Sequence, residues 1–139
     1  MNVETRSQQK ENVDKVGKLY SSIFAGDFDT VNAILSPDVV VHEAAALPYG
    51  GAFKGHEGFQ ELMVTLAGVW EDLKPIDMKM SGVDDLVLCH FTLTAKNRKT
   101  GSKLNMPLIE AWTLRDGRVV EGRVYYYDTM EVRQICGLE

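Results

Sequence analysis

Two glutamates of this 139-residue chain stand in apolar surroundings, where an isolated carboxylate is costly. Glu43 ends the run VVVHE, and Glu110 lies inside the run MPLIEAW. Burial raises the pKa of a carboxyl group, so two carboxyls in one apolar pocket can divide the roles of general base and neutral hydrogen-bond donor. The pair predicts acid/base catalysis. The alternative for Glu110 is a structural ion pair with Arg123 on a neighbouring strand.

His42 is the third catalytic candidate, as an acid or base beside Glu43. On a regular strand the two side chains point to opposite faces, so only one would enter a pocket unless the strand bulges. Helix packing or an interface is the other role open to His42. His90, in the middle of LVLCHFTLT, is expected to be a core residue.

The histidines do not predict a metal site. HEAAA lacks the second histidine of the zinc motif HExxH, and the spacing of the three histidines in the chain is not that of metal ligands. We therefore expect neither a metal nor any other cofactor.

Charge and composition exclude other classes. A net charge of −5, without a large basic cluster, argues against nucleic-acid binding. No apolar run approaches the roughly 18 residues that a membrane span needs, and the polar N-terminus has no signal-peptide core. We expect no membrane partner, a cytoplasmic location, and free thiols at Cys89 and Cys136.

The elements that must position these residues follow from periodicity. Apolar residues at helical spacing predict helices over about 13–25, 28–35 and 57–70, and alternation with turn signals predicts strands at 38–43, 76–82, 86–95, 104–114 and 119–128. The uninterrupted valines of the first strand indicate burial on both faces. Residues 1–10 are expected to be disordered, and a weak helical pattern follows residue 128. One domain over residues 1–139 fits this length.

Helices followed by a long antiparallel meander indicate an α+β fold, with the helices on one face of a curved sheet. The concave face of such a cone-shaped α+β barrel leaves an internal pocket of small-molecule size. Trp112 should share the pocket face of Glu110 because the two are two residues apart on a strand. The remaining candidates for binding a substrate are Tyr20, Tyr49, Tyr126 and Asp128.

The order of elements, with the segments AGDFDTVNAIL, SPDVVVHE, HEAAALPYGGAFKGHEG, PLIEAWTLRDGRVVE and YYYDT, resembles the nuclear transport factor 2-like superfamily over roughly residues 13–130. That superfamily includes ketosteroid isomerases and SnoaL-like polyketide cyclases, and the closest pattern is that of the ketosteroid isomerase-related group. The resemblance implies a cystatin-like cone.

The resemblance also implies roles for single residues. It makes Glu43 the catalytic base at the end of the first strand and Glu110 the protonated carboxyl that donates to an oxyanion. The oxyanion tyrosine of the isomerases aligns with Leu19, one residue before Tyr20, which would turn the Tyr20 side chain about 100° away from the pocket. That departure argues against a steroid isomerase.

Three functions stay open. The first is a cofactor-free isomerase, cyclase or lyase that acts on a small, largely apolar carbonyl or polycyclic compound. The second is a non-catalytic protein that binds a small hydrophobic ligand. The third is a dimerisation module, because aligning the last strand places Tyr125 and Tyr127 beside Arg123 on the convex face, where we expect a homodimer.

Overall fold

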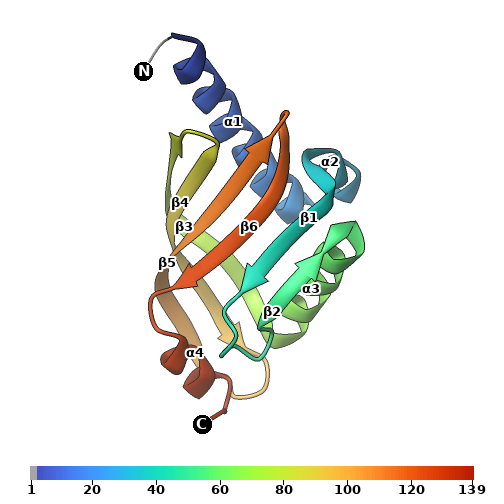
Figure 1. Cartoon of the computed structure of the whole chain (residues 1–139). Helices are drawn as coiled ribbons and strands as arrows, with labels where there is room; N and C mark the ends of the chain where they lie inside the picture. The colour runs from blue at the N-terminus through green and yellow to red at the C-terminus, as the bar shows by residue number, and fades with distance from the viewer. Residues whose placement is uncertain (1–2) are drawn as a thin grey trace.

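The computed structural model describes residues 3–139, which form one six-stranded sheet and four helices. The strand order is β2-β1-β6-β5-β4-β3, and every neighbouring pair is antiparallel except β1 and β6. Figure 1 shows the sheet curling around one side of the molecule. The strands are β1 (Leu35–Glu43), β2 (Gly51–Lys54), β3 (Trp70–Val83), β4 (Leu86–Asn97), β5 (Lys103–Arg115) and β6 (Arg118–Tyr126). The predicted α+β class and the meander β3–β6 are confirmed.

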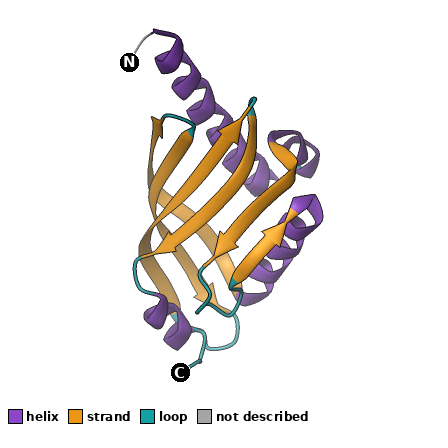
Figure 2. Cartoon of the chain, viewed as in Figure 1, coloured by secondary structure: helices purple, strands orange, loops and turns teal. Residues whose placement is uncertain are grey.

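Helices close the concave side of this sheet (Figure 2). They are α1 (Val3–Ala25), α2 (Phe28–Ile34), α3 (Gly55–Val69) and the short α4 (Thr129–Ile135) that follows β6. Asp27 begins α2 by accepting a hydrogen bond from the Thr30 amide, as expected from its position after Gly26. The core lies between the inner faces of α1 and α3 and the sheet.

The prediction of a disordered N-terminus is wrong for residues 3–10, which form the first turns of α1. These residues are mostly polar, and helical propensity rather than apolar burial favours the helix there. Residues 1 and 2 lie outside the described part of the chain.

Strand β1 alternates in burial, so the prediction that its valines are buried on both faces is also wrong. Val39 and Val41 are buried, whereas Val40 and His42 are only half-buried. The reason is that the described helices pack on the concave side, which leaves the outward residues without a covering layer. Glu43, two residues after Val41, points inward with the valines.

The segment after β1 turns sharply and returns as β2, a strand that was not predicted from the sequence. A Cβ at Gly50 would lie 2.4 Å from the Ala44 carbonyl oxygen, so only glycine fits this turn. The turn lets β2 pair antiparallel with β1, with Glu43 opposite Gly51. It also fixes the end of β1, where Glu43 stands.

Strand β3 bends twice. Asp72 and Asp77 both have φ of 56°, and the pairing of β3 with β4 shifts register next to each of them. Such bulges bend a strand and increase its twist. The bends help the sheet to close around the cavity described below.

No helix within residues 3–139 is long and apolar enough to cross a membrane. The thiols of Cys89 and Cys136 are both buried and free.

Candidate active site

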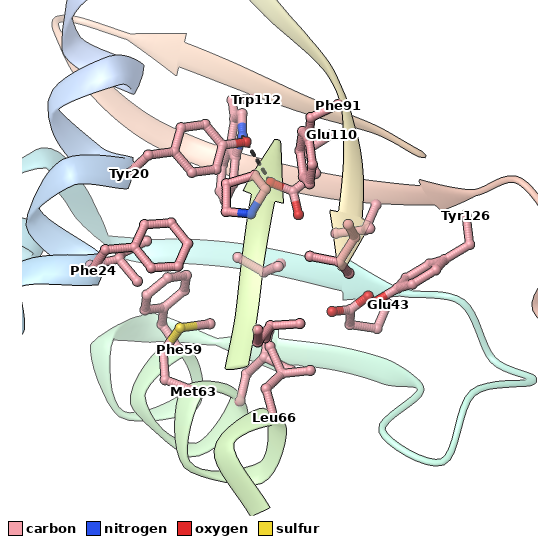
Figure 3. A pocket seen from close by; sticks show the side chains of 17 residues that line it. Tyr20, Phe24, Glu43, Phe59, Met63, Leu66, Phe91, Glu110, Trp112 and Tyr126 are labelled. Atoms are coloured by element: carbon pink, nitrogen blue, oxygen red, sulfur yellow. Dashed lines mark hydrogen bonds between the residues drawn. The ribbon is translucent and has the colours of Figure 1, made fainter. Parts of the chain in front are cut away.

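A cavity of about 120 Å³ lies between α1, α3 and the concave face of the sheet. Its wall is apolar apart from two carboxyls and a few aromatic polar groups (Figure 3). The lining residues are Tyr20, Ile23, Phe24, Val41, Glu43, Phe59, Leu62, Met63, Leu66, Leu73, Pro75, Phe91, Leu93, Glu110, Trp112, Val124 and Tyr126. The two glutamates that stood out in the sequence therefore share one small apolar space.

Glu110 is held at one end of this cavity by a chain of hydrogen bonds. Trp112 Nε1 donates to the Tyr20 hydroxyl at 2.8 Å, and that hydroxyl donates to Glu110 Oε1. Figure 3 shows Tyr20 reaching from α1 to the carboxyl on β5. Burial raises the pKa of Glu110 to about 7, and the hydrogen bond from Tyr20 opposes the rise because it stabilises the ionised form.

Glu43 has no such support. Its side chain is 7% exposed, and its Oε1 is buried without a hydrogen-bond partner. Burial raises the pKa of Glu43 to about 9, and negative charge on Glu110 contributes to the increase. Because the two carboxyls interact, they titrate as a pair, and Glu110 loses its proton before Glu43 does. At neutral pH Glu43 is the neutral member.

A second set of aromatic polar groups lies near Glu43. The hydroxyls of Tyr49 and Tyr126 are 2.8 Å apart, and Trp70 Nε1 donates to the Tyr49 hydroxyl at 3.3 Å. Burial raises the pKa of Tyr126, and Glu43 adds to the rise once it ionises, so the Tyr126 hydroxyl stays protonated. Tyr126 lines the cavity, whereas Tyr49 is buried behind it.

The structure corrects the orientation expected for Tyr20. Leu19 is fully buried in the core, and the next residue, Tyr20, enters the cavity with Ile23 and Phe24. These three positions recur at helical spacing and form the inner face of α1. The alignment by sequence motifs placed the isomerase tyrosine at Leu19, but the α1 residue that faces the cavity is the next one, Tyr20.

The structure does not bring His42 into the cavity. His42 points to the opposite face of β1 from Glu43, where its Nε2 lies 3.5 Å from Glu121 Oε2. No bulge separates it from Glu43, so the alternation of a regular strand holds. The expectation that His42 acts in the pocket is therefore not supported.

The alternative role weighed for Glu110, an ion pair with Arg123, and the core position expected for His90 are both wrong. Glu110 pairs with Val124 across β6 and faces inward, whereas Arg123 faces outward and lies 4.0 Å from Glu121 Oε1. His90 is exposed on β4 rather than in the core. In both cases strand alternation decided the face.

Two predicted binding residues lie elsewhere. Asp128 caps α4, accepting hydrogen bonds from the amides of Met130 and Glu131, and does not line the cavity. Tyr49 does not line the cavity but is hydrogen-bonded to Tyr126, which does. Both follow from local structure: a strand end before a helix needs a cap, and the turn after β1 carries Tyr49 into the core.

Two features near the cavity were not predicted from the sequence: the place of Trp70 behind the cavity wall and the part that α3 takes in that wall. Trp70, assigned to a helix, is the first residue of β3 and belongs to the hydrogen-bonded group near Glu43. Phe59, Met63 and Leu66 of α3 line the cavity, and their helical spacing was seen only as a core stripe. A helix face that covers a curved sheet can be both core and cavity wall.

No group of three or more His, Cys, Asp or Glu side chains that could hold a metal ion occurs among residues 3–139. The cavity contains two carboxyls and no histidine. The arrangement can bind a small apolar molecule and present to it one ionised carboxyl and one neutral carboxyl.

The model of the SnoaL-like domain family matches residues 16–122, which is most of the chain. The chain belongs to this family. The superfamily recognised in the sequence, nuclear transport factor 2-like, is thereby confirmed, and the solved structures below share its fold. A search of curated proteins found no match.

Several solved structures are similar to this SnoaL-like chain. An NTF2-like protein from Burkholderia xenovorans LB400 is 20% identical, with a TM-score of 0.86 over 92% of this chain and 97% of that one. TerC, co-crystallised with polyporic acid, is 20% identical, with a TM-score of 0.77 over 91% and 98%. A putative polyketide cyclase from Xanthomonas campestris pv. campestris is 18% identical, with a TM-score of 0.77 over 92% and 98%. At these identities the similarity establishes the fold.

Proposed function

We propose that this SnoaL-like protein is a cofactor-free acid/base enzyme that enolises a small, largely apolar carbonyl compound. The observation that carries the proposal is the unequal hydrogen bonding of two carboxyls in one cavity. Glu110 accepts a hydrogen bond from Tyr20, whereas Glu43 has a buried oxygen without a partner. The first arrangement favours a carboxylate and the second a neutral acid, which is the pair that enolisation needs.

In the proposed step, ionised Glu110 takes a proton from the carbon next to the carbonyl. The electron pair of the broken C–H bond forms a C=C bond, and the carbonyl π electrons move to oxygen. Neutral Glu43 donates a hydrogen bond to that oxygen. Return of the proton to a different carbon is an isomerisation, attack of the enolate on a second carbonyl is a cyclisation, and loss of a leaving group is a lyase reaction.

This assignment exchanges the roles that the family resemblance implies for Glu43 and Glu110. The physical reason is local: Tyr20 donates to Glu110, and no residue donates to Glu43 Oε1. A general base works best with its pKa near the working pH, which favours the glutamate whose pKa is about 7 over the one at about 9.

The relatives support the reaction class in general terms. Three neighbours are named as putative polyketide cyclases, and another was co-crystallised with polyporic acid. The cavity size favours a narrower substrate than the polycyclic one considered from the sequence. A cavity of roughly 150 Å³ holds benzene, and this one, of about 120 Å³, is smaller, so it favours at most one ring. The rest of a larger substrate would have to lie at the open side of the cavity, where Phe24 is 55% exposed.

The test is exchange of α-protons for deuterium in a panel of cyclic and aryl ketones, followed by NMR. We expect the native protein to catalyse exchange in at least one single-ring ketone. Glu110→Gln should lower the rate at least about a hundredfold. Glu61→Gln, exposed on α3, is the matched control and should keep the rate. Exchange that survives Glu110→Gln would contradict the proposed base.

A non-catalytic binding protein is the second candidate, favoured by the predominantly apolar wall and the unpartnered oxygen of Glu43. Such a protein would hold a small hydrophobic ligand and release it chemically unchanged. Native mass spectrometry after long incubation with a bound ketone separates the two functions. An unchanged ligand without deuterium uptake would favour binding.

We further propose that two copies associate through the convex face of the sheet. Ile109, Tyr125 and Tyr127 are exposed and line one shallow groove there with His90. Beside them Glu121 and Arg123 offer opposite charges that a two-fold axis can pair. Sedimentation at micromolar concentration should give a dimer, and Tyr125→Glu should give a monomer. A native monomer would contradict the proposal.

A further inference from the structure

The protons near Glu43 can be assigned by counting donors. Trp70 Nε1 can only donate, so the Tyr49 hydroxyl accepts from it. Among residues 3–139, the only other group bonded to this hydroxyl is the hydroxyl of Tyr126. Tyr49 is 3% exposed, and a buried hydroxyl proton without an acceptor is unfavourable. Tyr49 therefore donates to Tyr126.

This assignment leaves the proton of Tyr126 without an acceptor in the described protein. Tyr126 is half-buried and lines the cavity, so its proton can reach a ligand there. Glu43, which lines the same cavity and interacts electrostatically with Tyr126, has a buried oxygen with no partner. Figure 3 shows both side chains on the same side of the cavity.

The other tyrosine of the cavity is not available for this task. Tyr20 uses its single proton on Glu110 and accepts from Trp112. The tyrosine of the first helix therefore supports the base rather than the substrate oxygen. The unsatisfied hydrogen-bonding groups of the cavity gather at the end where Glu43 and Tyr126 stand.

We infer that Tyr126 and neutral Glu43 together bind the carbonyl oxygen of the ligand, and that Tyr49 and Trp70 position and polarise the Tyr126 hydroxyl. The inference rests on the proposed carbonyl substrate, but binding of a carbonyl does not require turnover. Two donors on one oxygen stabilise the charge that develops there during enolisation. Chained hydrogen bonds strengthen one another, so Tyr126 is a better donor with Tyr49 behind it. The bound ketone then presents its α-carbon to Glu110.

The test uses acetophenone labelled with ¹³C at the carbonyl and measures its C=O stretch by infrared difference spectroscopy. Hydrogen bonds lower this frequency. With the native protein we expect saturable binding and a stretch well below that of acetophenone in hexane. Tyr126→Phe keeps the ring and removes the donor. The C=O stretch should therefore rise about half of the way back to its value in hexane, and binding should weaken about tenfold.

Two further variants separate positioning from general damage. Tyr49→Phe leaves Tyr126 in place as a donor but removes the group behind it, so we expect a smaller upward shift of the stretch. Val64→Ala, on α3 and 68% exposed, should leave the spectrum unchanged. Thermal unfolding verifies that each variant is folded, and Tyr49→Phe remains informative if Tyr126→Phe is not.

An unchanged C=O stretch in Tyr126→Phe would overturn the inference, as would the absence of saturable acetophenone binding by the native protein. Failure of the proposed function has a different signature. In that case the stretch still shifts through Tyr126, but no deuterium enters the methyl group of the bound ketone.

Discussion

The two ends of the cavity are built from the same kinds of residue and differ in where the hydrogen bonds stop. At one end, Trp112 and Tyr20 form a chain that finishes on the carboxyl of Glu110. At the other, the chain from Trp70 and Tyr49 finishes on Tyr126 and leaves the Glu43 Oε1 without a partner. One carboxyl receives a proton donor, and the other does not.

This difference teaches how one residue type acquires two roles. Glu43 is buried and Glu110 is half-buried in the cavity wall, and removal from solvent raises the pKa of each. The hydrogen bond from Tyr20 stabilises the charged form of Glu110 only. Once Glu110 carries a charge, that charge further disfavours ionisation of Glu43. A single hydroxyl therefore decides the order in which two similar acids titrate.

The largest expected effect comes from exchanging each carboxyl for an amide. Glu110→Gln removes the base and should lower α-proton exchange at least about a hundredfold, whereas Glu43→Gln keeps a donor at the oxygen end and should lower it only about tenfold. Parallel exchange assays at one pH measure both. Equal losses in the two variants, or a larger loss for Glu43→Gln, would contradict the assignment of Glu110 as the base and Glu43 as the hydrogen-bond donor.

A second prediction tests the hydrogen bonds from Trp112 and Tyr20 to Glu110 by disturbing the packing of Trp112. A Cβ at Gly122 would lie 2.5 Å from Cζ3 of Trp112, so Gly122→Ala must displace the indole that donates to Tyr20. We expect a loss of about 1–3 kcal/mol in the free energy of unfolding, measured by urea denaturation. Gly68→Ala is the control: no heavy atom lies within 4 Å of a Cβ there, so it should stabilise α3 slightly.

The third prediction concerns stability and pH. Glu43 keeps its proton in the folded protein up to a pKa of about 9, whereas in the unfolded chain it loses the proton near the ordinary glutamate pKa of 4.5. The folded state thus binds more protons between these values, and stability falls as pH rises through this window. We expect a decrease of at least about 1 kcal/mol from pH 7 to pH 9, from urea titrations. Glu43→Gln should flatten the slope. A slope unaffected by that substitution would mean that Glu43 is already ionised at neutral pH.

The smallest expected effect is a shift in the pH dependence of proton exchange when the Tyr20 hydroxyl is removed. The exchange rate should rise with pH as Glu110 ionises near pH 7 and fall as Glu43 ionises near pH 9. Tyr20→Phe removes the donor that favours ionised Glu110, so the lower limb should move about one unit to higher pH. Tyr127→Phe, 81% exposed, should leave the profile unchanged. A lower limb that stays in place in Tyr20→Phe would show that the hydrogen bond does not control the base.

Much of the fold could be predicted because its signals are local. The helical stripe up to Phe24, the cap at Asp27 and the Asp116–Gly117 turn each fix an element within a few residues. Predictions were wrong where pairing with residues far along the chain decides the secondary structure. Trp70 was assigned to a helix because its spacing fits α3, yet pairing with Asn97 makes it the start of β3.

The sequence by itself determined which face most strand residues take. Alternation puts Glu43 and His42 on opposite sides of β1, and it puts Glu110 and Trp112 on the same side of β5, because the side-chain period of a strand is two residues. The tertiary structure alone decided which donor meets which acceptor. Tyr20 and Glu110 are 90 residues apart, and Tyr49 and Tyr126 are 77 apart. Such contacts depend on how α1 and the turn after β1 pack onto the sheet, and no local periodicity records that.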